Sequence, residues 1–160
     1  MPCLFYNMHV MVIHLSMVIK YLSQLAKADP LVFAGDFNFN PSSDCYKLAT
    51  EGNLSPSSSD FPDRPEWEKD WSAETGVRLV SAYREVQGDE PNFTNNAQVD
   101  QDDPFIDTLD YIFRTSGVIA TKVLPLKNRN DVAGQLPTAN EPSDHLMLAS
   151  DFEIKGQRGR

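Results

Sequence analysis

The sequence predicts a mixed α/β domain, or a closely related α+β layered one, from the order of its elements. An amphipathic helix comes first, followed by a short buried strand, a second helix, a long loop and several strands. The 160 residues are the size of one domain, and a chain of this length can bury a sizeable core. Eleven Pro and eight Gly residues add many loops between these elements.

The first helix is predicted over residues 8–26, where apolar residues recur at spacings of three and four. Asn7 is a suitable N-cap. The helix should end before Asp29-Pro30, because the residue before a proline avoids the helical conformation. The apolar run over 8–19 is too short to span a bilayer and follows no basic segment. We therefore expect no signal peptide and no membrane insertion.

A short buried strand is predicted over 31–34, and Gly35 would then let the chain turn sharply. The second helix should begin after Pro41, with Ser43 or Asp44 as its N-cap, and end at Gly52. The segment 53–76 is rich in Ser, Pro, Asp and Glu. It is predicted to be a long loop with one helical turn near 66–71.

The second half of the chain is predicted to consist of strands joined by polar loops. β-Branched and aromatic residues indicate strands, whereas clusters of Pro, Asn and Asp indicate loops. The expected strands are residues 77–83 (a strand or a mixed segment), 109–113, 118–126 and 146–154. The expected loops are residues 87–104 and 127–142, and residues 155–160 form a disordered tail.

The net charge is −9 and the pI about 4.7. A surface this acidic repels phosphate backbones, so we expect no broad electrostatic footprint on nucleic acid. The same surface suits divalent cations, which would bridge a phosphate substrate to the acids. Cys3 and Cys45 do not have the spacing of a metal motif. One disulfide between them is arithmetically allowed, but a reduced intracellular protein is the simpler interpretation.

Asp36 and Asn38 directly follow the first predicted strand. Residues two apart on an extended segment point the same way, so a carboxylate and an amide would face one spot. Together they can handle a hydrolytic water and a phosphate oxygen. The alternative is a simple turn, because Asp and Asn are common turn residues.

Two further polar groups lie beside predicted strands: Asp110 opens one, and Asp144-His145 precedes the last. A carboxylate can hold a histidine in one tautomer and keep it ready to exchange a proton. Asp110 is the best acid to orient His145, as the acid of a catalytic triad orients its base. Alternatively, Asp110 is only a strand-edge acid, Asp144 a loop residue and His145 a strand residue.

The ordered combination of these segments resembles the endonuclease/exonuclease/phosphatase superfamily. The segments are Gly35-Asp36-Phe37-Asn38, Leu109-Asp110-Tyr111-Ile112-Phe113 and Pro142-Ser143-Asp144-His145-Leu146. The resemblance implies a divalent-metal-dependent phosphoesterase on a four-layered α/β sandwich. Residues 1–154 match the C-terminal half of that domain, with a mixed, mostly antiparallel sheet and helices on one face.

The resemblance also implies roles for individual residues. Asp36 would activate or position the attacking water, and Asn38 would hydrogen-bond the scissile phosphate. His145 would contact the phosphate and stabilise its developing charge, with Asp110 fixing the ring. Asp144 would lie at the metal, for which Mg²⁺ is expected and Mn²⁺ is the alternative.

Within the superfamily, Phe93-Thr94-Asn95 and Phe105 look most like the deadenylase branch. In those proteins an aromatic residue five positions before the strand's acid stacks on a nucleotide base, and Phe105 occupies that place. Phe105 and Asn95 would then bind substrate, which suits single-stranded RNA or a nucleotide. The alternative is that Phe105 only packs. The family usually has Gly two residues after the aromatic, where this chain has Asp107.

The family's first half supplies a metal-binding Glu, and no Glu precedes Glu51 here. Met1-Pro2-Cys3 resembles the tail of a strand whose preceding His belongs to the family's site. We therefore expect a truncated chain that is inactive alone and self-associates through an exposed sheet face. A complete, shortened protein is the alternative.

Two other functions stay open at this point. One is a non-catalytic fragment or degenerate half-domain that binds a partner. The other is a phosphatase of inositol or sphingolipid head groups with the same chemistry. For the leading function, a metal-dependent nuclease or phosphodiesterase, a cytoplasmic or nuclear location is expected because the sequence shows no signal peptide.

Overall fold

The computed structural model describes residues 1, 6–63, 71–98, 103–132 and 134–155. In chain order its elements are α1 (Met8–Ala26), β1 (Val32–Asp36), α2 (Asp44–Glu51), β2 (Val80–Ser81), α3 (Ala82–Gln87), β3 (Asn95–Ala97), β4 (Phe105–Asp107), β5 (Asp110–Arg114), β6 (Val118–Val123), the 3₁₀ turn η1 (Arg129–Asp131) and β7 (Ser150–Ile154). The strands pair antiparallel in the orders β1-β5-β2, β3-β4 and β6-β7. This confirms the predicted α/β class.

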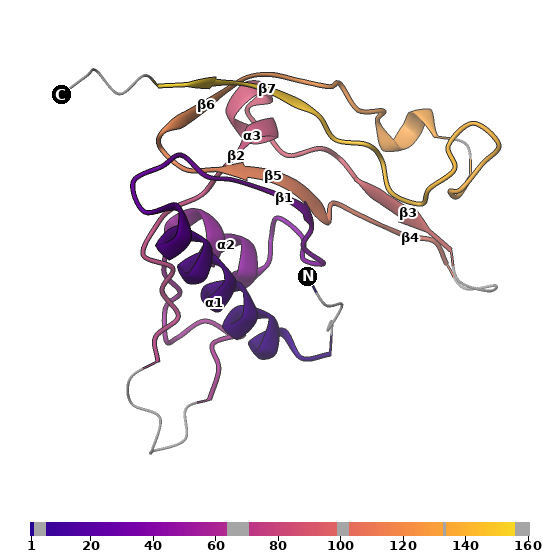
Figure 1. Ribbon diagram of the computed structural model, residues 1–160. Coiled ribbons are helices and arrows are strands. Elements are labelled where there is room, and N and C mark those ends of the chain that lie inside the picture. Colours follow the sequence, from indigo (N-terminus) through magenta and orange to yellow (C-terminus); the bar gives the residue numbers. More distant parts are fainter. Residues whose placement is uncertain (2–5, 64–70, 99–102, 133, 156–160) are drawn as a thin grey trace.

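The elements form layers around β5. α1 and α2 lie on one side of β1 and β5, and β6 and β7 run along the other side (Figure 1). Alternate residues of a strand face opposite sides. Accordingly, Tyr111 and Phe113 pack in the larger core with α1 and α2, whereas Ile112 packs in a smaller cluster with α3 and β6. The two predicted helices therefore share one face of the sheet, as expected.

The ends of α2 follow the predicted chemistry. The side chain of Ser43 accepts a hydrogen bond from the backbone N–H of Tyr46 at 3.2 Å, which satisfies a free donor of the first turn. Gly52 ends the helix with φ +82°, a left-handed conformation that a residue without Cβ adopts at low cost. Both predicted boundaries of α2 are confirmed.

The predicted turn at Gly35 is wrong. Gly35 lies inside β1 and pairs with Tyr111, and the strand continues to Asp36. The strand extends this far because β5 offers a partner to every residue as far as Asp110. The left-handed position comes later, at Asn38, whose φ is +54°.

Two predicted segments turn out differently. Residues 77–83, expected as a strand or mixed segment, contain only the two-residue β2 before α3 begins. The side chain of Ser81 caps α3 by accepting the N–H of Arg84, and Gly88 ends it. The predicted loop over 87–104 contains β3, which is buried although it reads Asn-Asn-Ala. Its polar side chains escape strand prediction because tertiary hydrogen bonds, not apolar character, allow their burial.

The later strands are shorter than predicted. β6 ends at Val123, before Pro125, and β7 begins only at Ser150. Most of the predicted helical turn near 66–71, and the tail over 156–160, lie outside the described residues.

By length and composition, α1 is the one helix in the described part of the chain that passes for a membrane span, with 19 residues and a mean hydropathy of 1.2. It is longer than the apolar run over 8–19 on which our prediction was based. One of its faces is buried in the core, through Met11, Val12, Leu15, Ser16 and Ile19. A single packed face is typical of a core helix.

A cluster of aromatic rings in the larger core packs against the end of β1. Phe37 is 1% exposed and lies edge-on to Phe33, Phe39, Tyr111 and Phe113, with ring centroids 4.7–5.8 Å apart. Such pairs each contribute about 0.5–1.5 kcal/mol beyond burial. The buried ring of Phe37 thus anchors the segment that carries its two polar neighbours in sequence.

Candidate functional site

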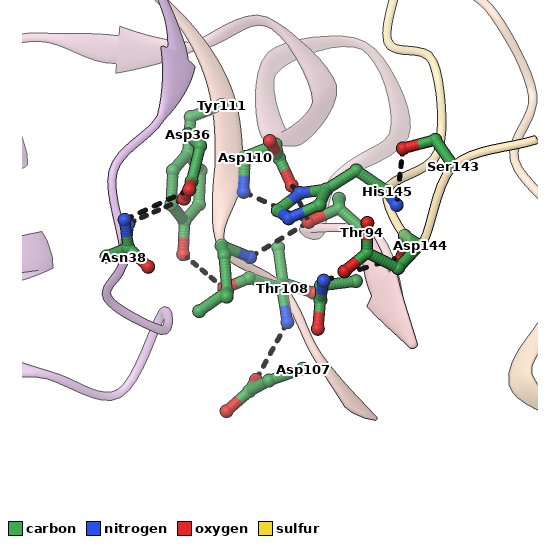
Figure 2. Close-up of polar contacts among 12 residues, drawn as sticks. Asp36, Asn38, Thr94, Asp107, Thr108, Asp110, Tyr111, Ser143, Asp144 and His145 are labelled. Carbon is green, nitrogen blue, oxygen red and sulfur yellow. Dashed lines mark hydrogen bonds and ion pairs between the residues drawn. The ribbon is translucent and has the colours of Figure 1, made fainter. Parts of the chain in front are cut away.

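The polar site begins at the paired ends of β1 and β5. Asp36, the last residue of β1, lies directly opposite Asp110, the first residue of β5. Two carboxylates in this position repel each other. The repulsion is tolerable because a third group, the ring of His145, lies against Asp110 (Figure 2).

Asp36 and Asn38 meet, but not as neighbours on an extended strand. The chain turns at Asn38, and Oδ1 of Asp36 accepts the backbone N–H of Asn38 at 2.8 Å. The Asn38 side-chain amide donates to Oδ2 of Asp36 at 3.0 Å and to the carbonyl oxygen of Met1 at 2.7 Å. The turn interpretation is therefore correct for the backbone. The turn is also what brings the two side chains together.

Asp110 and His145 form the predicted pair. Nδ1 of His145 lies 2.8 Å from Oδ2 of Asp110, and the side chains are 31% and 15% exposed. Partial burial of the ring acts to lower the pKa of His145. The hydrogen bond and charge of Asp110, with the charges of Asp36 and Asp144, outweigh that effect and raise the pKa of His145 above its usual value.

Asp144 and Asn95 lie beside this pair. The carbonyl oxygen of Asp144 accepts the backbone N–H of Asn96 at 2.9 Å and the side-chain amide of Asn95 at 3.4 Å. Asn95 also pairs with His145 in an antiparallel bridge. Hydrogen bonds therefore join the segment that carries His145 to β3, which explains how His145, although outside any strand, is held in a fixed position.

Phe105 lies on the neighbouring strand. Its side chain is 43% exposed and faces Ala97 across the β3–β4 pair, and the next pair on the same face is Asn95 with Asp107. The separation along the strand is two residues, or about 7 Å. The Asp107 carboxylate is held by the side chain of Asn40 at 3.1 Å and the backbone N–H of Thr108 at 2.8 Å. Phe105 and Asn95 thus share one face of this hairpin.

The described residues do not assemble a metal centre by themselves. In that part of the chain, no three His, Cys, Asp or Glu side chains are grouped so that they could hold an ion. Asp36, Asp110 and Asp144 offer the hard oxygen atoms that Mg²⁺ prefers. They do not form a complete ligand set here, so the role of Asp144 as a metal ligand stays a prediction.

Sequence reasoning missed Thr94. It lies in a polar segment without strand periodicity, and its side chain is 0% exposed. Its Oγ1 donates to Oδ2 of Asp110 at 2.7 Å, on the oxygen that also contacts His145. The stretch Phe93-Thr94-Asn95 carries a resemblance, but nothing in its local pattern indicates that its threonine supports the acid.

Comparison with known proteins gives one matching family and several similar sequences. The model of the Endonuclease/Exonuclease/phosphatase family matches residues 6–145. The chain is 36% identical over 129 residues to "Carbon catabolite repressor protein 4 homolog 4" of Arabidopsis thaliana, covering 78% of this chain and 27% of that protein. It is 32% identical over 135 residues to "CCR4-Not complex 3'-5'-exoribonuclease subunit Ccr4" of Aspergillus terreus, covering 82% and 19%. It is 29% identical to "2',5'-phosphodiesterase 12" of Rattus norvegicus, covering 79% and 20%.

Solved structures show the same fold. ANGEL2, described as a 2',3'-cyclic phosphatase and solved in complex with adenosine-2',3'-vanadate, superposes with a TM-score of 0.71 at 23% identity. The superposition covers 93% of this chain and 53% of the ANGEL2 chain. The human Nocturnin catalytic domain gives a TM-score of 0.55, with 91% and 41% coverage. The chain thus spans about half of the ANGEL2 structure and about a quarter or less of these curated relatives.

Proposed function

The chain belongs to the endonuclease/exonuclease/phosphatase family, in its deadenylase-like branch, and from that premise we propose that it serves hydrolysis of phosphoester bonds in RNA or nucleotides. The observation that carries the proposal is the register of β1 and β5. It sets Asp36 opposite Asp110 and leaves His145 bound to Asp110 on the same strand ends.

Each of these residues has a role that its contacts support. Asp36 would accept a proton from the attacking water, because a carboxylate is a general base. His145, with a raised pKa, is a ready proton donor and cation for a phosphate oxygen, and Asp110 orients it. The Asn38 amide already donates to two oxygens. To hold the scissile phosphate it must exchange one of those bonds for a phosphate oxygen.

The proposed cofactor is Mg²⁺, with Mn²⁺ as the alternative. A divalent ion would neutralise charge on the phosphate, and Asp144 would supply one of its ligands. The proposed roles of Asp36, Asn38 and His145 need only this chain's own side chains, because the described residues do not form a complete metal site.

The proposed substrate is single-stranded RNA or a nucleotide. Phe105 presents a half-exposed ring on the hairpin face that it shares with Asn95, whose strand pairs with His145. Aromatic side chains bind bases by stacking, which is worth about 1–3 kcal/mol per base. Replacement of Phe105 by Ala should weaken the binding of AMP or oligoadenylate by that amount, whereas Phe152→Ala in the smaller core cluster should not. An RNA-directed role would place the chain in the cytoplasm or nucleus.

A non-catalytic role is the second candidate function. It is favoured by the incomplete ligand set of the described residues and by the coverage of about half of the ANGEL2 chain. On this view residues 1–154 are part of a larger domain and the isolated chain is inactive. Self-association through the sheet follows from the same view, because β1 is an edge strand of the β1-β5-β2 sheet. Size-exclusion chromatography that gives a stable monomer would count against self-association.

The test of function is turnover with Mg²⁺, measured side by side on oligoadenylate and on inositol or sphingolipid head-group phosphates. The 160-residue chain is assayed beside the longest product of the gene that contains it. We expect hydrolysis of oligoadenylate by the second sample and its loss in Asp36→Ala and His145→Ala. Unchanged activity in those variants would exclude the assigned roles. Turnover of the lipid head groups alone would favour the phosphatase, and no turnover or Mg²⁺ binding in either sample would favour the non-catalytic role.

A further inference from the structure

The hydroxyl of Thr94 has all of its hydrogen-bonding capacity in use. Oγ1 accepts the backbone N–H of Leu109 at 2.9 Å and that of Asp110 at 3.0 Å, and it lies 2.7 Å from Oδ2 of Asp110. A hydroxyl has one hydrogen and two lone pairs. Because the two amides take both lone pairs, the single hydrogen must point to the Asp110 carboxylate.

This direction decides where the next proton lies. The same Oδ2 is 2.8 Å from Nδ1 of His145, so one hydrogen joins these two atoms. A carboxylic acid is a stronger acid than an imidazolium, and Oδ2 is already an acceptor from Thr94. The hydrogen therefore resides on Nδ1. In the neutral ring Nε2 is then the nitrogen without a hydrogen, and it is the one that points away from Asp110.

The backbone of Thr94 holds the other partner. Its carbonyl oxygen accepts the N–H of Leu146, the residue after His145, at 2.7 Å. One buried residue thus restrains the acid through its side chain and the histidine-bearing segment through its carbonyl. A rotation of the carboxylate would break the contacts to Thr94 and His145 together.

We propose that Thr94 is a positioning residue that fixes the Asp110 carboxylate and thereby holds neutral His145 in the tautomer with hydrogen on Nδ1. Nε2 is left to exchange a proton with the substrate. The proposal deepens the proposed function and rests on it only for the consequence for turnover. The tautomer itself can be measured without any reaction.

The test is a nitrogen–proton NMR correlation of the imidazole rings at a pH where all are neutral. The chain has three histidines, His9, His14 and His145, and His145→Gln assigns the third. We compare the wild-type chain with Thr94→Ser, which keeps the hydroxyl, and with Thr94→Val, which keeps the shape but loses it. Thr75→Val is the matched control, because Thr75 is also buried and its hydroxyl donates to the carbonyl oxygen of Val77.

We expect the Nδ1–H tautomer in the wild type, in Thr94→Ser and in Thr75→Val. In Thr94→Val, which frees the Asp110 carboxylate to rotate away from the ring, a measurable population of the Nε2–H tautomer should appear, because this is the more stable form of an unrestrained imidazole. An Nε2–H ring in the wild type, or an unchanged ring in a folded Thr94→Val, would overturn the proposal. If Thr94→Val does not melt cooperatively, Thr94→Cys, with its weaker donor, should show a mixture of tautomers, and an unmixed Nδ1–H ring there would contradict it.

The turnover readout is kept separate. In the active gene product, Thr94→Val should lower kcat about 10- to 100-fold, the usual loss when a supporting partner of a site residue is removed. KM should stay near its wild-type value and Thr94→Ser should restore kcat. If the wild type shows no turnover, the proposed function is wrong. The NMR measurement of the His145 tautomer then still tests the role of Thr94 independently.

Discussion

Each end of β5 pairs an acidic side chain with a basic one, but only at one end do the charges balance. At Arg114, the guanidinium contacts both carboxylate oxygens of Glu85, with Nε 3.0 Å from Oε2. The backbone N–H of Ala120 also donates to Oε2 at 3.0 Å. Burial acts to raise the pKa of Glu85, but Arg114 and this amide outweigh it, so the pKa is lowered.

At the Asp110 end, one histidine faces three acids. Asp36, Asp110 and Asp144 all act to raise the pKa of His145. The Arg114 end is a cross-link between α3, β5 and β6 whose charges cancel. The Asp110 end keeps an excess of negative charge and a ring that can take up a proton. Charge left unbalanced at a partly exposed position is a feature of reactive sites, whereas balanced charge is a feature of structural ones.

Turnover should separate the two ends most strongly. On the proposed function, His145→Gln should lower the kcat of the gene product by about 10²–10⁴-fold, the usual contribution of a proton-transferring side chain. Glu85→Gln, the matched change at the other end, should leave the kcat of the folded enzyme near the wild-type value. Steady-state kinetics well below the melting temperature compares them, and equal losses would remove the distinction.

Stability should separate them in the opposite sense. Arg114→Met keeps the aliphatic stem but leaves the Glu85 carboxylate without its cation, and breaking a buried ion pair of this kind costs about 3 kcal/mol. Both side chains are mostly buried, at 12% and 21% exposed. Ser143→Ala at the other end removes an exposed hydroxyl that accepts the backbone N–H of His145, and it should change stability by less than about 0.5 kcal/mol. Urea unfolding of the two variants checks the order.

The two ends should lose stability in opposite pH ranges. Since the folded pKa of His145 is raised, its contribution is fully present below its usual value of 6.5 and is lost as the pH rises through the folded pKa. Since the folded pKa of Glu85 is lowered, its contribution is present above its usual value of 4.5 and is lost as the pH falls through the folded pKa. The melting temperature should therefore depend less on pH than in the wild type above pH 6.5 in His145→Gln, and below pH 4.5 in Glu85→Gln. An effect of either variant on the other side would contradict this assignment.

The smallest effect is expected from Mg²⁺ alone. The acids at the Asp110 end should attract the ion weakly, because the described residues offer no three-ligand group. Titration with Mg²⁺ should move the NMR resonances of Asp144 and His145 and leave those of Glu85 and Arg114 in place, and chelation should reverse the change. Equal shifts at both ends would indicate unspecific screening.

Much of the fold could be predicted where local pattern and tertiary burial agree. The apolar periodicity of α1, and the Ser43 and Gly52 ends of α2, gave correct helices because the same side chains that cap or pack are neighbours in sequence. β3 could not be predicted in the same way. Its buried Asn95 and Asn96 are stabilised by hydrogen bonds to segments 38 and 49 residues away, and no local pattern contains those partners.

The candidate site likewise contains residues that the sequence could predict and residues that it could not. Asp36, Asp110 and His145 could be chosen because each is a polar residue at the end of an apolar run. The alternation of side chains along a strand does not explain how Asp36 and Asn38 meet, since they meet through a turn with φ +54° at Asn38. Thr94 could not be chosen at all. Its importance comes from a hydrogen bond across 16 residues to Asp110.

The sequence by itself determined which chemical groups stand at the ends of the strands and to which family the motifs point. Only the tertiary structure decided that Asp36 faces Asp110, that the Thr94 hydroxyl is saturated, and that one end of β5 is balanced by Arg114 while the other is not. The physical reason is that strand register and hydrogen-bond direction depend on partners far along the chain. A residue's type determines which hydrogen bonds it can donate or accept, but the fold determines which partner it bonds.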